Sequence, residues 1–240
     1  MGTAAETPMI PAAFNGPLDS GNGGYASAVF AALVDGPAAV SLRSPVPLET
    51  PLDAVTSDDG SVRVMNGETL VAEVSPAAEV DLEVPEPVGV EEARAAARNY
   101  RGTAEGLFGR CFVCGRARED GFDVFAGAVA SREGLVASPW TPPAWTADDE
   151  GNVRDEFVWA VLDCPTYFAL YPDSYPLSFL VRMRARVDAP VRAGEEHVVI
   201  AWPIEKHGRK HLAGSAVLSA GGEVLVMAEG LLIDTGGVQA

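Results

Sequence analysis

Two stretches of the sequence return in a second version much farther along the chain. Residues 41–52 and 184–195 share an extended, arginine-containing strand pattern that ends in a proline-containing turn. Residues 61–76 and 215–230 alternate around a two-residue turn, Asn-Gly in one copy and Gly-Gly in the other, which is the pattern of a β-hairpin. A repeat over such a long separation indicates duplication of a whole domain rather than a solenoid of short units.

Each copy also contains one short segment that is apolar on almost every side. Residues 25–34 have a single polar interruption, at Ser27, and residues 157–162 have none. A helix without a polar face is buried all round, so the strand-rich flanks predict an antiparallel sheet wrapped around each helix. Pro37 and Pro165 predict where the two helices stop, because proline disfavours a helical residue before it.

The repeats predict an α+β chain with two domains. We assign residues 1–90 to the first repeat and residues 107–240 to the second, joined by a linker at 91–106 that contains a good helix-forming sequence. The first strand of the second repeat is expected at 121–130. Residues 138–153 are expected to form a long loop, and loops of that length are usually functional or mobile.

The net charge of −17 argues against a general nucleic-acid binder, because neutralising phosphates requires lysine and arginine. No apolar run approaches the ~20 residues of a membrane span, so we expect neither nucleic acid nor membrane as a partner. The few cations are nonetheless grouped into a row of arginines on one strand and a basic turn. Together the two groups would suit a ligand with a few phosphates. The alternative interpretation of the arginine row is a solvated strand face. The grouped cations are Arg182, Arg184, Arg186, Lys206, His207, Arg209, Lys210 and His211.

The three cysteines, Cys111, Cys114 and Cys164, are too few for a disulfide framework and indicate the reducing cytoplasm. Cys111 and Cys114 form a single C-x-x-C motif, which offers two of the four ligands that a structural zinc site needs. Cys164 and the three histidines show no pairing spacing. We therefore expect buried thiols, no metal and no cofactor.

Residues 15–25 lead into the first apolar helix through Gly-Gly-Tyr, and the strand that follows ends in Leu-Arg-Ser-Pro at 42–45. This layout resembles the hotdog fold of acyl-CoA thioesterases, and the paired repeats resemble the two-hotdog acyl-CoA thioesterase II type. The Cys-Phe-Val-Cys-Gly motif at 111–115 is similar to a lead-in sequence of some hotdog relatives. The resemblance implies a tandem (double) hotdog fold, with an antiparallel sheet around a central helix in each repeat, and a homodimer of two such chains as the assembly.

The resemblance also implies residue roles. Gly23 and Gly24 match the family's Gly-Gly helix start, whose N–H groups would bind the thioester carbonyl; otherwise glycine serves close packing of the helix on the sheet. Asp155 matches the family's helix-opening catalytic aspartate, which would activate water, and its other reading is a helix N-cap. Asp163 follows at the far end of that helix, where a carboxylate opposes the helix dipole. A gapless alignment of the repeats places Asp163, rather than Asp155, at the mouth of a later helix.

Two positions depart from the family pattern. Ala228 stands where the family has its catalytic glutamine. The family's threonine falls near Phe179 and Leu180, with Ser178 close by. These departures keep two functions open: hydrolysis of an acyl-CoA or acyl-carrier thioester, which we favour, and non-catalytic binding of an acyl thioester or a fatty acyl chain. Enoyl-thioester hydration ranks last, because no histidine lies near either helix start.

Five further residues are candidates for substrate binding. Ser20 and Asn22 precede the glycine pair and would either orient the thioester or cap the helix, with capping preferred. Tyr25 follows the glycine pair directly. Arg209 and Lys210, in the basic turn, would bind phosphate groups if the ligand is a coenzyme A ester.

Overall fold

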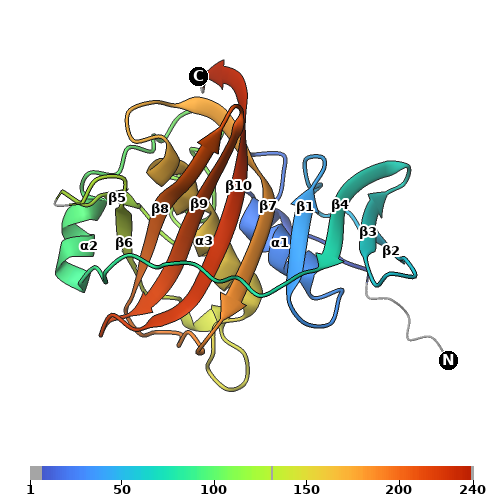
Figure 1. Ribbon diagram of the computed structural model, residues 1–240, viewed down its shortest axis with the longest axis horizontal. Coiled ribbons are helices and arrows are strands. Elements are labelled where there is room, and N and C mark those ends of the chain that lie inside the picture. Colours follow the sequence, from blue (N-terminus) through green and yellow to red (C-terminus); the bar gives the residue numbers. More distant parts are fainter. Residues whose placement is uncertain (1–6, 131, 239–240) are drawn as a thin grey trace.

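The computed structural model describes residues 7–130 and 132–238 and contains one 10-stranded sheet with helices packed on both of its faces (Figure 1). The strands are β1 (Ala38–Leu42), β2 (Asp53–Thr56), β3 (Val62–Asn66), β4 (Thr69–Pro76), β5 (Gly127–Ala128), β6 (Val136–Trp140), β7 (Pro176–Val187), β8 (His197–His207), β9 (Lys210–Ser219) and β10 (Val224–Val238). The helices are α1 (Gly23–Ala31), α2 (Val90–Ala97) and α3 (Asp155–Leu170), and short 3-10 helices lie at Ala12–Phe14 and Ala144–Thr146.

The strand order on one side of the β1–β7 pair is repeated on the other side, where two further strands follow. The sheet runs β2-β3-β4-β1-β7-β10-β9-β8-β6-β5, and every neighbouring pair is antiparallel. Where the two halves meet, β1 pairs with β7, with Val40 opposite Met183. Outward from β1 the order is β4, β3, β2, and outward from β7 it is β10, β9, β8, followed by β6 and β5. Helix α1 directly precedes β1, and α3 directly precedes β7.

The repeated sequence segments occupy matching places in this order. Residues 41–52 begin on β1 and residues 184–195 begin on β7, which are the strands after α1 and α3. Both predicted hairpins are present, as β3–β4 and β9–β10. Gly67 and Gly222 have positive φ angles of 57° and 89° in the two turns, a conformation that glycine adopts without steric cost.

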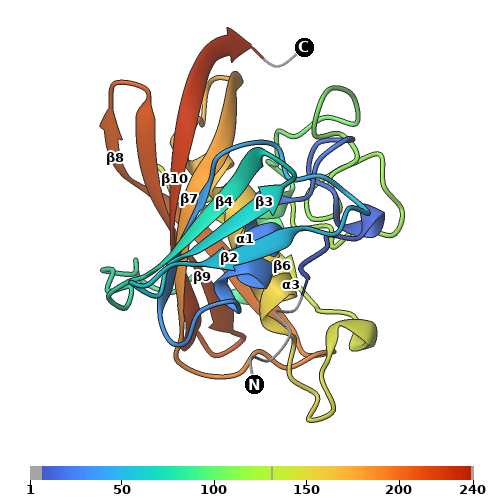
Figure 2. The same ribbon diagram turned by 90° about the vertical axis from the view of Figure 1, so that its right-hand side faces the viewer.

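Both apolar helices are buried, as their sequences predict. In α1 six of the nine residues are buried, and in α3 every residue from Phe157 to Leu162 is buried. Both helices contact the same face of the sheet and also each other, as the side view in Figure 2 shows. They are the centre of the main apolar core, so their position determines which side chains can meet between the two halves of the sheet.

Helix α3 is longer than the sequence predicted. Pro165 was expected to end it, but the helix continues through this proline to Leu170. An internal proline removes a hydrogen bond and costs about 3 kcal/mol, so packing must outweigh that loss. Thr166, Ala169 and Leu170 are all buried beyond the proline, and their burial supplies the compensating free energy.

The start of the second half also differs from the prediction. Only Gly127–Ala128 of the expected strand at 121–130 joins the sheet. Phe122 and Val124 are buried, but their N–H groups donate to the carbonyls of Phe112 and Val113 in the cysteine-containing loop. The expected long loop at 138–153 is shorter, because β6 extends to Trp140.

The linker crosses the outer face of the sheet. Residues 77–89 run over β10, β9 and β8 to α2, which packs on β6 (Figure 1). Val80 and Val88 are each 1% exposed and pack on outward-facing residues of these strands. Alternate residues of a strand point to opposite faces, so α1 and α3 cover one face, and the linker and α2 cover part of the other. Within the part of the chain that the structure describes, no helix is both long and apolar enough to cross a membrane.

Candidate functional site

A cavity of about 770 Å³ lies where the two halves of the chain meet. Its walls come from the approach to α1, the end of β1, the loop at 100–114, α3 and β7. The lining is largely apolar and aromatic, and includes Phe108, Tyr167, Phe168, Phe179, Leu180 and Leu232. A cavity of this size and character suits a mainly apolar ligand of a few hundred Å³.

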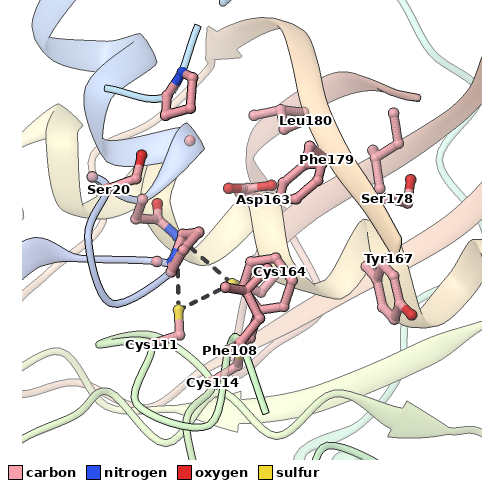
Figure 3. A pocket seen from close by; sticks show the side chains of 18 of the residues that line it. Ser20, Phe108, Cys111, Cys114, Asp163, Cys164, Tyr167, Ser178, Phe179 and Leu180 are labelled. Atoms are coloured by element: carbon pink, nitrogen blue, oxygen red, sulfur yellow. Dashed lines mark hydrogen bonds between the residues drawn. The ribbon is translucent and has the colours of Figure 1, made fainter. Parts of the chain in front are cut away.

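Asp163 is one of the carboxyl groups that line this cavity, and it lies between the two halves of the chain (Figure 3). It lies on α3, and its Oδ2 accepts a hydrogen bond of 2.9 Å from the backbone N–H of Gly24 at the start of α1. The N-terminus of a helix carries unpaired N–H groups and a partial positive charge. One helix therefore supplies a carboxylate, and the other supplies the positive pole that stabilises it.

Burial raises the pKa of Asp163 from 3.8 to about 7. The N–H groups of Gly24 and Gly23 offset part of this rise, while a negative charge on Cys111 adds to it. A carboxyl group with a pKa near neutrality can both accept and return a proton at physiological pH. Strongly shifted pKa values of this kind concentrate at functional sites.

Close contact between the helices explains why the start of α1 is Gly-Gly. A Cβ atom on Gly24 would lie 2.3 Å from the carbonyl oxygen of Trp159 and 2.8 Å from Cβ of Asp163. Trp159 and Asp163 are four residues apart, so they share one face of α3. Glycine is therefore required at position 24 because α1 packs closely against α3, and not because α1 packs closely against the sheet. Gly23 lines the cavity, where a Cβ would come within 3.0 Å of Leu180 Cδ2.

The three cysteines lie on the cavity wall near Asp163 (Figure 3). Asn22 lines the cavity with them. Asn22 Oδ1 accepts the N–H of Tyr25, which confirms its predicted capping role, and Asn22 Nδ2 points to the sulfur atoms of Cys111 and Cys164. Hydrogen bonds from the Cys114 and Cys164 thiols lower the pKa of Cys111. Sequence spacing missed the association of Cys164 with the C-x-x-C motif, because the fold brings α3 to this loop.

The structure does not bring Asp155 to the glycine pair, so the expected composite site of Asp155 with Gly23 and Gly24 is not formed. The two helices run in opposite directions, and Asp155 lines a separate surface groove with the C-terminal end of α1. Burial raises the pKa of Asp155. It is the first residue of α3 and not its N-cap, which is Arg154.

The remaining candidates divide between the cavity and its surroundings. Ser20 lines the cavity, but Tyr25 packs in the aromatic core, with its ring centroid 4.5 Å from that of Phe14. Arg209 and Lys210 are not among the residues that line the cavity, and the Arg209 side chain donates to the carbonyl of Asp234. The basic turn is thus not part of this cavity, contrary to expectation.

The arginine row faces away from the cavity. Arg182 and Arg184 pair with Glu229, and Arg186 pairs with Asp188. The row therefore carries its own counter-ions, as a solvated strand face does. The cationic side chain that lines the cavity is that of Arg43, and it forms an ion pair with Glu73.

Ser178 is held by a buried hydrogen-bond network that the sequence did not reveal. Tyr171 Oη lies 3.0 Å from Ser178 Oγ and 2.7 Å from His211 Nδ1. His211 Nε2 lies 3.1 Å from the carbonyl of Gly208, so we assign the proton to Nε2 and let Nδ1 accept from Tyr171. Ser178 is then left as the donor to Tyr171 at the cavity wall. Ala228, at the position of the family's glutamine, is fully buried in the core.

No family model matches the chain, and a search of curated proteins finds no similar sequence. Solved structures do match. The TesB protein of Mycobacterium avium subspecies paratuberculosis superposes with a TM-score of 0.53 at 13% identity, over 98% of this chain and 90% of that protein. The chain has the fold of TesB. The fold resemblance predicted from the sequence is thereby confirmed, in a large antiparallel sheet with few helices.

Shorter matches cover parts of the chain. A thioesterase superfamily protein matches with a TM-score of 0.45 at 19% identity, over 50% of this chain and 61% of that protein, which is less than two thirds of its length. The PaaI protein from the phenylacetic acid degradation operon of E. coli matches with a TM-score of 0.47 at 13% identity, over 62% of this chain and 97% of PaaI.

Proposed function

We propose that the chain is a tandem of two hotdog repeats that hydrolyses an acyl thioester, carried by coenzyme A or by an acyl carrier, with Asp163 as the general base. The observation that carries this proposal is the partly buried Asp163 carboxyl group, which accepts a hydrogen bond from the Gly24 N–H at the wall of an apolar cavity. The repeated strand order supports the tandem arrangement, with α1 directly before β1 in one repeat and α3 directly before β7 in the other.

In this mechanism the apolar cavity holds the acyl chain and the α1 N-terminus faces the thioester carbonyl. Gly24 N–H fixes Oδ2 of Asp163, which leaves Oδ1 to accept a proton from a water molecule. The water oxygen bonds to the carbonyl carbon, the carbon–sulfur bond breaks, and the proton passes to the departing thiolate. The products are a carboxylic acid and the free thiol of the carrier.

The cavity also offers a donor for the negative charge that develops when water attacks the thioester carbonyl. Negative charge builds up on the carbonyl oxygen, and a preorganised donor in a water-poor site stabilises it most effectively. Gly23 lies in the cavity lining at the positive end of the α1 dipole. Its N–H, which favours the Asp163 carboxylate before the ester binds, is the donor that we assign to this oxygen once the ester is bound. The carboxylate and the donor then stand on facing helices.

Non-catalytic acyl binding is the second candidate function, and one observation favours it. The position of the family's glutamine is occupied by Ala228, which is buried in the core and is absent from the cavity lining. Asp163 thus has no amide partner from that position to hold the water. The cavity itself serves binding equally well with or without hydrolysis.

One assay separates the two functions. The full chain is mixed with straight-chain and aromatic acyl-CoA esters of increasing size and with the matching pantetheine esters, and the release of free thiol is followed. We expect hydrolysis of at least one ester, with the preferred acyl group limited by the cavity volume. Saturable binding without thiol release would replace hydrolysis by the binding function, and absence of both would contradict the proposed ligand class.

A further inference from the structure

The three cysteine side chains lie together on one wall of the cavity, although they come from distant parts of the chain. Their Sγ atoms all lie within 4.8 Å of one another, and Cys111 Sγ is 3.7 Å from Cys164 Sγ. Cys111 and Cys114 are buried, and Cys164 is partly buried. The hydrolytic mechanism uses none of the three, so the cluster needs a separate explanation.

The segment from Cys111 to Gly115 forms a tight turn that presents two sulfur atoms on one side. Gly115 N–H donates to the Cys111 carbonyl at 2.8 Å, and the N–H groups of Val113 and Cys114 donate to the Cys111 sulfur. A Cβ at position 115 would lie 2.5 Å from Cys111 N, so the turn closes only around glycine. Hydrogen bonds from backbone N–H groups stabilise a thiolate.

The sulfur positions fit a tetrahedral metal site. Zinc–thiolate bonds of about 2.3 Å place neighbouring sulfur atoms about 3.8 Å apart in a tetrahedron. The Cys111–Cys164 separation of 3.7 Å already has this value. Since all sulfur pairs lie within 4.8 Å, no pair has to close by more than about 1 Å.

We propose that Cys111, Cys114 and Cys164 bind a zinc ion as three thiolates, with the fourth coordination position open to the cavity. The C-x-x-C spacing is typical of zinc sites, and three protein ligands with an open fourth position are typical of zinc sites that take up water or a ligand. All three cysteines line the cavity, so the open position accepts a water molecule or a thiol. The proposal revises the sequence-based expectation of three unligated thiols.

Asn22 suits a site with surplus negative charge. Its Nδ2 lies 3.9 Å from Cys111 Sγ and 3.7 Å from Cys164 Sγ. Three thiolates around a divalent cation carry one excess negative charge, which these N–H groups offset. Hydrogen bonds from outside the ligand set commonly fix the orientation of metal ligands. The Asn22 side chain would do so here, and it also caps α1.

Metal analysis tests this inference directly. The full chain is purified without a polyhistidine tag under reducing conditions, and its metal content is measured by mass spectrometry. We expect about one zinc per chain. After zinc removal, titration with cobalt(II) should give near-ultraviolet thiolate-to-cobalt charge-transfer absorption and visible bands of tetrahedral intensity.

Variants then identify the ligands. Cys164→Ser and Cys114→Ser should each weaken cobalt binding by at least tenfold and reduce the charge-transfer intensity. Asp163→Asn changes the neighbour of Cys164 but no ligand, and it should keep both metal content and spectrum even where hydrolysis is lost. The spectrum of the wild-type chain keeps the test decisive if a serine variant fails to fold.

Three outcomes would overturn the assignment: a chain free of zinc that gives no charge-transfer absorption with cobalt, copper found in place of zinc, or a mass lower by two hydrogen atoms that reveals a disulfide between two of the cysteines. None of these outcomes bears on thioester hydrolysis. A failure of the zinc site and a failure of the proposed function are therefore distinguishable.

Discussion

Asp163→Asn should lower the rate of thioester hydrolysis by about 10²–10⁴-fold, the range expected for loss of a general base. Asparagine is nearly the same size, and its Oδ1 can still accept the Gly24 N–H that Asp163 Oδ2 accepts at 2.9 Å. It also removes the cost of ionising a buried carboxyl group. The melting temperature should therefore not fall, while kcat falls. The measurement is steady-state thiol release with the best acyl ester, paired with thermal unfolding.

Asp155→Asn is the matched control. The same substitution of aspartate by asparagine is made on the same helix, but Asp155 lies at the other end of α3, in the groove next to the C-terminus of α1. We expect its activity to stay within about twofold of the wild type, since surface changes away from the site have small effects. An inactive Asp155→Asn variant beside an active Asp163→Asn variant would contradict the assignment of the base.

Gly24→Ala should be strongly destabilising, because its methyl group would lie 2.3 Å from the Trp159 carbonyl oxygen. Overpacking of this kind costs roughly 3 kcal/mol. For a chain of this size that corresponds to a fall of about 10 °C in melting temperature. Trp159 O is backbone on α3 and cannot rotate away, so the helices must separate. Thermal and urea unfolding measure the effect.

Gly89→Ala serves as the control for Gly24→Ala. Gly89 has a φ of −71°, and a Cβ there would meet no atom within 4 Å. The free energy of unfolding of this variant should differ from that of the wild type by no more than about 1 kcal/mol. A weaker N-cap lowers it, and a less flexible unfolded chain raises it. Equal losses at both positions would mean that the close approach of α1 to α3 is not what requires glycine at position 24.

The parts of the fold that local patterns encode could be predicted from the sequence. The hairpins β3–β4 and β9–β10 followed from alternation around Asn-Gly and Gly-Gly turns. The two buried helices followed from segments without a polar face. These features depend on neighbours a few residues apart, which is the range over which sequence patterns act.

The errors arose where tertiary packing overrides local preference. Pro165 signals a helix end, but burial of the following turn carries α3 on to Leu170. That extension moves Asp163 from a helix end to the helix interior, facing Gly24. The favoured alignment therefore chose Asp155. The gapless alternative chose Asp163 but placed it at the mouth of a later helix, whereas it lies within α3.

The cysteine cluster could not be predicted from spacing. Cys164 lies far from the C-x-x-C motif in sequence, and the two are joined only because the loop at 100–114 folds over α3. The same is true of the bond between Tyr171 and His211. Contacts of this type depend on the full topology and leave no periodic signal in the sequence.

A crystal structure of Asp163→Asn soaked with the preferred acyl-CoA tests the central claim most directly. We expect the acyl chain among Phe108, Phe179 and Leu180, with the thioester carbonyl next to the N–H of Gly23 and the residue-163 side chain within reach of a water molecule on the carbonyl carbon. An acyl group bound instead in the groove beside Asp155, or a thioester whose carbonyl points away from α1, would contradict the account.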